Sequence, residues 1–176
     1  MRKLILALIG ICFLAVPALA QDDNDPTFEV FGGYSPRHLD LVAIDDNAHG
    51  FLTSVTVNPF RTKAVGFEGE FGGHFGSIPG VSYEAYTAMV GPKVAGRFDR
   101  VTPWGHLLFG GQHIRGGGAS SNDFGMTMGG GIDVNASRHV AVRVVQADYL
   151  YVRVAEGSLL KDTNSYRFAF GIVLKW

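Results

Sequence analysis

The sequence predicts an all-β protein, namely an eight-stranded antiparallel up-and-down transmembrane β-barrel preceded by a cleaved signal peptide. Three observations support this prediction. Large apolar residues alternate with small or polar residues along the chain, glycine (24 of 176 residues) and aromatic residues (13 Phe, 6 Tyr and 2 Trp) are abundant, and the connectors differ systematically in length. Aromatic residues favour strands, and glycine allows tight turns and close strand packing, so this composition disfavours helices.

The first twenty residues have the three parts of a secretory signal peptide. Arg2 and Lys3 precede an apolar run, Leu4–Val16, and the small-residue ending Ala18-Leu19-Ala20 follows. The run is shorter than the ~20 apolar residues that a membrane-spanning helix needs. We therefore expect residues 1–20 to be removed on export and residues 21–176 to form the barrel domain.

The C-terminal segment shows the alternation most clearly. One face carries large apolar side chains and the other carries charged or small ones, the first set being Tyr166, Phe168, Phe170, Ile172, Leu174 and Trp176. A helix would distribute these six residues around its axis, whereas a strand places them on one face. The segment is therefore predicted to be a β-strand.

Seven earlier segments alternate in the same way. In chain order the expected strands span about residues 27–34, 50–57, 64–75, 82–95, 102–112, 124–134 and 140–152. In the last of these the alternation changes phase near Gln146–Tyr149, which predicts a β-bulge there.

The connectors between these segments alternate between long and short. Long connectors are expected at Ser35–His49, His113–Asp123 and Arg153–Thr163, with a shorter one at Gly76–Val81. The others are tight turns of a few residues. This arrangement is typical of a membrane barrel, whose outer rim carries long loops and whose inner rim carries short turns.

Residue size indicates which face of the sheet points outward. The polar face is rich in Ala, Ser, Thr and Gly, the glycines including Gly66, Gly91, Gly125, Gly129, Gly131 and Gly171. Small groups suit the interior of an eight-stranded barrel, which is only just wide enough for side chains. We expect the large aromatic residues outside, in contact with lipid, because they would not fit inside. A soluble barrel with an apolar interior is the alternative.

The assigned alternation places charges of both signs in the lumen. The expected inward set contains four carboxylates and four cations: Glu29, Glu68, Glu70, Asp133, Lys93, Arg143, Arg167 and Lys175. Buried charges persist when they are paired, so matched numbers predict a salt-bridged, mostly closed lumen. A narrow gated pore for ions or small solutes, opened when the pairs exchange partners, is the alternative.

The mature chain resembles the OmpA/OmpX-like family of eight-stranded outer-membrane β-barrels. The most specific part is the C-terminal strand NSYRFAFGIVLKW, which ends on an aromatic residue. In that family this ending is the signal read by the barrel-assembly machinery, and here it falls on Phe168, Phe170, Ile172, Leu174 and Trp176. The resemblance implies residence in the outer membrane, with membrane lipid and the assembly machinery as partners.

Other function classes find less support in the sequence. The balance of 15 Lys and Arg against 16 Asp and Glu offers no basic face for nucleic acid. A lipid-modifying enzyme remains an alternative, because several catalytic residue types could meet at the outer rim: His74, His113, Ser120, Ser121 and Asp123. The histidines lack metal-ligand or triad spacing. We therefore expect no enzyme, no cofactor and no metal site, and a monomer with a structural or adhesion-like role whose long loops meet an extracellular partner.

Overall fold

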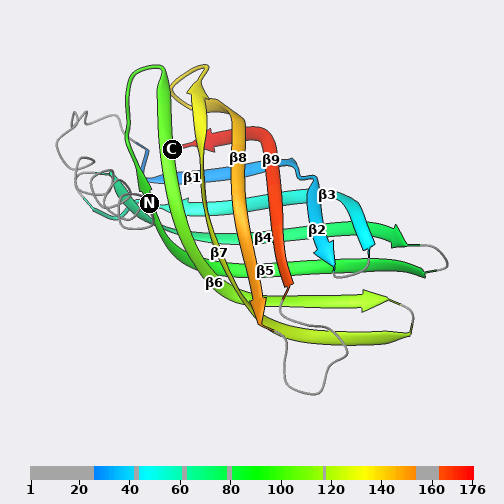
Figure 1. The fold of residues 1–176 in the computed structure, drawn as a ribbon. Helices are drawn as coiled ribbons and strands as arrows, with labels where there is room; N and C mark the ends of the chain where they lie inside the picture. Colours follow the sequence, from blue (N-terminus) through cyan, green and yellow to red (C-terminus); the bar gives the residue numbers. More distant parts are fainter. Residues whose placement is uncertain (1–25, 42–43, 61–62, 79–80, 117, 154–162) are drawn as a thin grey trace, which may run out of the picture.

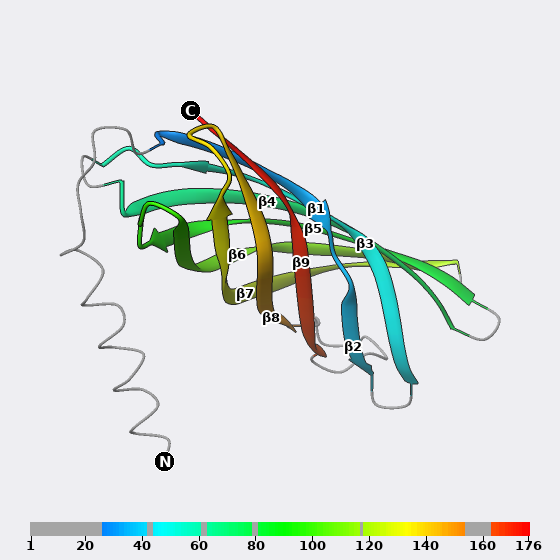
Figure 2. The same cartoon turned by 90° about the horizontal axis from the view of Figure 1, so that it is seen from above.

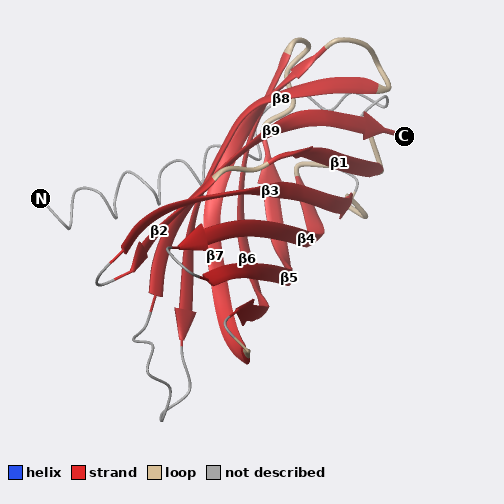
Figure 3. Ribbon diagram, turned by 90° about the vertical axis from the view of Figure 1, so that its right-hand side faces the viewer, coloured by secondary structure: helices blue, strands red, loops and turns tan. Residues whose placement is uncertain are grey.

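The computed structural model describes residues 26–41, 44–60, 63–78, 81–116, 118–153 and 163–176. Its elements are all strands (Figure 3): β1 Phe28–Tyr34, β2 Arg37–Leu41, β3 Ile44–Val57, β4 Val65–Ile78, β5 Val81–Ala95, β6 Val101–Gly116, β7 Ala119–Asn135, β8 Val140–Arg153 and β9 Thr163–Lys175. In these ranges no helix is long and apolar enough to cross a membrane. The predicted signal peptide, residues 1–20, lies outside the described residues.

The strands form a closed antiparallel barrel. From β3 to β9 each strand pairs with the next one in the chain, and β1 closes the barrel by pairing with both β3 and β9 (Figures 1 and 2). Backbone hydrogen bonds between Phe28 and Trp176, of 2.9 and 3.0 Å, bring the two ends of the barrel together at the rim with the short turns. The predicted up-and-down topology is confirmed.

β1 and β2 are two parts of one barrel strand. Tyr34 lies opposite Phe51 and Arg37 opposite Ala48, which is one continuous register along β3. The same continuity holds along β9. Only Ser35 and Pro36 separate the two parts, and the interruption falls there because proline has no N–H to donate to the ladder. The barrel therefore has eight strands although nine segments are labelled.

Two of the expected long connectors are largely strand. β2 and the beginning of β3 occupy most of residues 35–49, and β6 runs to Gly116 before β7 begins at Ala119. The hydrophobic alternation fades in these stretches, but the hydrogen-bond ladder continues beyond it, so apolar periodicity underestimated the strand lengths. The third long connector falls mostly on residues 154–162, which lie outside the described ranges.

The outer face of the barrel is apolar, as predicted. Its exposed large side chains come from every strand whose side chains are described and include Phe28, Phe51, Phe67, Val90, Phe109, Phe124, Met128, Val142, Phe168 and Ile172. The five residues of the expected assembly signal, four on β9 and Trp176 directly after it, are all exposed on this face. Such a surface is unfavourable in water and suited to lipid.

Large aromatic side chains do lie inside the barrel, which corrects the expectation that large rings would not fit there. Phe31 and Trp104 are both lumen-facing and buried. Glycines provide the space: a Cβ on Gly33 would approach the Phe31 ring to 2.7 Å, and one on Gly131 would approach the Trp104 ring to 2.7 Å. The interior admits a large side chain where its neighbour has none.

The bulge in β8 lies slightly earlier than predicted. Ile132 pairs with Val145 but Asp133 pairs with Arg143, so Val144 is the extra residue. Val144 and Val145 both face outward, and the residues on either side, Arg143 and Gln146, both face the lumen. The sequence shows the phase change only after the bulge, which is why it was expected near Gln146–Tyr149.

Replacing Phe170 with Asp should block insertion of the barrel. Phe170 is half exposed on the outer face of β9, where a carboxylate would meet hydrocarbon at a cost of about 1–3 kcal/mol besides the lost aromatic contact. The measurement is the amount of folded protein in the membrane fraction, with Phe170→Leu as the matched control. Normal amounts of folded Phe170→Asp protein would contradict the assignment of this face to lipid.

Candidate functional site: the charged lumen

The lumen contains charged side chains of both signs. Among the described residues, six carboxylates and six lysine or arginine side chains are buried: Glu29, Glu68, Glu70, Asp123, Asp133, Asp148, Arg37, Lys93, Arg97, Arg143, Arg167 and Lys175. This set includes all eight residues assigned to the lumen from sequence. The additional members are Arg37, Arg97, Asp123 and Asp148.

Arg167 on β9 links two carboxylates across the middle of the lumen. Its Nη2 donates to Glu70 Oε1 on β4 at 2.7 Å and to Asp148 Oδ2 on β8 at 2.6 Å, and its Nε also donates to Asp148 Oδ2 at 3.1 Å. Arginine is suited to this position because its planar guanidinium donates in several directions at once. The three strands that supply these groups are thereby joined through the lumen.

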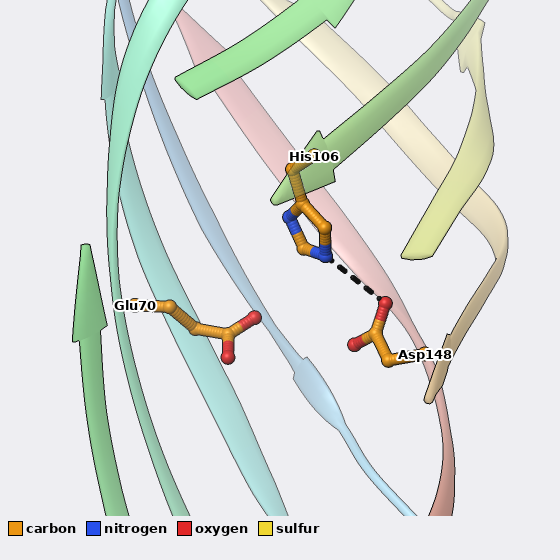
Figure 4. Close-up of side chains that lie close together, drawn as sticks. All are labelled: Glu70, His106 and Asp148. Atoms are coloured by element: carbon orange, nitrogen blue, oxygen red, sulfur yellow. Dashed lines mark hydrogen bonds and ion pairs between the residues drawn. The ribbon is translucent and has the colours of Figure 1, made fainter. Parts of the chain in front are cut away.

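His106 on β6 lies between the carboxylates of Glu68 and Asp148. Its Nδ1 is 3.0 Å from Glu68 Oε2. Its Nε2 is 3.1 Å from Asp148 Oδ1, the contact drawn in Figure 4. Carboxylate oxygens only accept, so both bonds form together only when the ring carries a proton on each nitrogen. His106 is then a further cation and joins β4, β6 and β8 in the same network as Arg167.

Nearer the short turns, Glu29 and Glu68 share the ammonium group of Lys93. Lys93 Nζ lies 3.7 Å from Glu29 Oε2 and 3.8 Å from Glu68 Oε1, and Arg97 Nη1 donates to Glu29 Oε1 at 2.6 Å. Lys175 donates to the Asn135 side chain at 2.6 Å. The ion-pair network therefore extends from the middle of the lumen to the rim with the short turns.

Arg143 is held by both a carboxylate and the two buried rings. It donates to both oxygens of Asp133 at 2.9 and 3.2 Å, and its guanidinium carbon lies 4.1 Å from the Phe31 ring centre and 4.2 Å from that of Trp104. These are cation–π distances. The β8 bulge also brings Gln146 to Arg143 Nη1 at 2.8 Å, so the bulge is what completes this part of the lumen.

Glu70, His106 and Asp148 lie close enough to share a metal ion, since one ligand atom from each falls within 4.8 Å of the others. All four carboxylate oxygens, however, already accept hydrogen bonds from Arg167, His106 or Gln146. Arg167 also places a fixed positive charge against both acids. The donor set therefore fits an ion-pair network better than a metal centre.

Arg37 lies above this network, toward the hairpin tips. Its Nε and Nη2 donate to Ser165 Oγ at 3.1 and 2.9 Å, and its Nη2 also reaches Gln112 Oε1 at 3.3 Å. No carboxylate of the described residues forms an ion pair with it. The upper lumen is thus held by neutral partners, unlike the middle.

The catalytic candidates do not come together as a triad in the described structure. Ser121 donates to Asp123 at 2.8 Å, whereas His113 contacts Asn122 at 2.7 Å. His74 contacts Ser35 instead, at 3.0 Å. Ser35 donates its single hydroxyl hydrogen to the Phe168 carbonyl, so His74 Nε2 must donate to Ser35 and does not act as its base.

Sequence reasoning missed four of the lumen charges because the alternation pattern did not assign those positions to the inward face. Arg37 and Asp123 fall in stretches interpreted as connectors, and Arg97 falls in an expected tight turn. Counting every second residue onward from the inward-facing Phe31 would have placed Arg37 inward as well. Asp148 follows the bulge, which reverses the alternation on which the assignment depended.

Comparison with known proteins decides the fold class. No protein-family model matches the chain, and no curated protein matches it in sequence. Among solved structures, Neisserial surface protein A matches with a TM-score of 0.72 and 13% identity, covering 85% of this chain and 97% of that one. This chain has the fold of an outer-membrane β-barrel.

Two further structures have the same fold. Ail, the attachment invasion locus protein of Yersinia pestis, matches with a TM-score of 0.62 and 17% identity, over 86% of this chain and 99% of its own. The outer membrane protein OprG from Pseudomonas aeruginosa matches with a TM-score of 0.57 and 11% identity, over 88% and 99%. The resemblance to OmpA/OmpX-like eight-stranded barrels is thereby confirmed at the level of the fold.

Replacing Arg167 with Met should destabilise the barrel strongly. The change leaves Glu70 and Asp148 buried without their main cation, which costs about 3–5 kcal/mol. The measurement is the free energy of unfolding in urea, with the exposed Arg138→Gln as control, for which a change within about 0.5 kcal/mol is expected. Equal stability of the two variants would show that the central ion pairs are not coupled to the fold.

Proposed function

We propose that this protein is an integral outer-membrane β-barrel with a structural or surface-interaction role and a closed lumen. The observation that carries the proposal is the ion-pair network across the middle of the lumen, in which Arg167 and His106 connect β4, β6, β8 and β9. An eight-stranded barrel leaves little space beyond its side chains, so paired charges there act as a plug. The proposal includes export by a cleaved signal peptide, insertion by the barrel-assembly machinery, a monomeric state and no enzymatic activity.

The hairpins opposite the short turns support the surface-interaction part of the proposal. β6 and β7 extend to Gly116 and Ala119, well beyond the ~9–11 residues that a membrane-spanning strand needs. The exposed residues near this tip are polar and include Arg115 and Ser120. Two proteins of the same fold carry names that contain the words surface or attachment, which agrees with a role for these hairpins.

The lumen is expected to be electrically silent. Protein purified from membranes and reconstituted in a planar bilayer should show no stepwise conductance, because the Arg167 and His106 links close the path. Folding must be verified in the same preparation, for example by protease resistance. Defined openings that change size in Glu68→Gln or Arg143→Gln would contradict the closed lumen.

Such openings would support the second candidate, a narrow gated pore. One feature favours it: Glu68 is shared by Lys93 and His106, and Asp148 is shared by His106 and Arg167. Each acid can lose one cation and keep the other. Exchange of ion-pair partners could therefore open a path for ions through the lumen while each buried carboxylate keeps one cation.

Shortening the β2–β3 hairpin should abolish surface attachment without affecting assembly. Replacing residues 39–46 with Asn-Gly keeps the pairing of His38 with Asn47 and supplies a two-residue turn. The measurement is adhesion of cells that express the protein to extracellular matrix or host cells, with the amount of folded protein in the membrane as control. Two outcomes would contradict the adhesive role of this hairpin. Either the shortened variant adheres as well as wild type, or the wild-type protein itself confers no adhesion.

A further inference from the structure

The outer wall of the barrel carries a groove where two adjacent strands present small residues. Phe71, Ala88, Gly111 and Phe124 lie opposite one another on β4, β5, β6 and β7, which makes them a continuous outward-facing row. Because Ala88 and Gly111 are small, the row is hollow between its two phenylalanines. The groove lined by this row has a volume of about 570 Å³.

The wall of the groove on the β4 side is fixed by aromatic contacts. The rings of Phe71 and Tyr86 are nearly parallel with centres 6.3 Å apart, and Phe75 meets Tyr86 edge-on at 6.0 Å. Stacked rings of this kind hold one another in place. The groove is therefore a preformed feature of the wall, bounded on the other side by Phe124.

The groove changes from apolar to polar toward the hairpin tips. Tyr86, His113 and Asn122 form the next row, in which His113 Nδ1 and Asn122 Oδ1 are 2.7 Å apart. One row further lie Arg115 and its neighbour Ser120, both exposed. Arg115 forms no ion pair among the described residues.

The acidic neighbour of Arg115 is engaged elsewhere. Glu84 lies opposite Arg115 on β5, but its carboxylate accepts a hydrogen bond from the Tyr86 hydroxyl at 3.3 Å and does not come within 4.0 Å of the guanidinium. The side of Arg115 that faces Ser120 therefore remains accessible to an anion. The apolar groove matches the acyl chain of a lipid, and the accessible cation above it matches an anionic head group.

We propose that this groove binds one acyl chain of an anionic, phosphate-bearing membrane lipid, with the phosphate against Arg115 and Ser120. The inference rests on the proposed residence in a membrane, since only there does the outer wall meet lipid. The volume lies in the range of about 300–1,000 Å³ that is usual for small-molecule sites. Arg115 lies two rows beyond Gly111 toward the hairpin tips, and a basic side chain near the end of a membrane strand can meet lipid phosphates at the membrane surface.

The chain offers a matched pair of variants that test the groove. A Cβ on Gly111 would touch only the Asp123 carbonyl at 3.7 Å, so Gly111→Leu fills the groove without displacing the backbone. Gly69 also faces outward, has nothing within 4 Å of its Cβ position, and does not line the groove. Gly69→Leu is therefore the control, with the same chemical change on the same face.

The experiment is native mass spectrometry of protein purified from membranes in detergent and titrated with phosphatidylglycerol. We expect wild type and Gly69→Leu to retain one lipid molecule, and Gly111→Leu to retain about tenfold less at the same lipid concentration. Equal retention by all three proteins would overturn the proposal, because the lipid would then be a non-specific annulus. Recovery of folded protein from the membrane reports separately on the proposed residence there.

A second comparison tests the phosphate contact. Arg115→Gln should reduce the preference for phosphatidylglycerol over phosphatidylcholine severalfold, whereas Arg138→Gln, at an exposed position in the opposite turns, should leave it unchanged. A preference that survives Arg115→Gln would overturn the assignment of the head-group contact. Loss of the preference in both variants would indicate a general charge effect and would also overturn it.

Discussion

The narrow interior of an eight-stranded barrel governs how the charged side chains of this protein are arranged. Such a lumen is only just wide enough for side chains, so water cannot solvate the charges that point into it. They must satisfy one another instead. Arg167 and His106 meet this requirement by bridging carboxylates from strands far apart in the sequence. The ion pairs therefore join opposite walls of the barrel across the lumen.

Glycine placement determines where the wall is hollow and where it is filled. Gly33 and Gly131 face inward and leave room for the rings of Phe31 and Trp104, on which Arg143 is held. Gly111 faces outward beside Ala88 and leaves the groove on the lipid-facing wall. A glycine therefore has different effects on the two faces. On the inner face it allows a neighbouring ring to pack closely, and on the outer face it leaves a groove.

The fold and the identity of the inward charges were largely accessible from sequence, and the exceptions share a cause. Period-two alternation assigned each residue to a face as long as the strand was regular and partly apolar. It failed for Asp148, because the Val144 bulge reverses the phase, and for Arg37, because the strand continues past Pro36 into a polar stretch. Expected strand ends were too early for the same reason. Hydrogen-bond ladders need no apolar side chains.

The order of residues along the chain was enough to predict the all-β class, the number of strands, the apolar outer face and the opposite charges inside. Each of these follows from the order of residues along one strand and its immediate neighbours. Which charges pair, the entry of the Phe31 and Trp104 rings into the lumen, and the groove between β4 and β7 became evident only from the three-dimensional structure. These features depend on barrel closure, which brings residues such as Glu70 and Arg167, 97 positions apart, within 2.7 Å, and no local pattern encodes that distance.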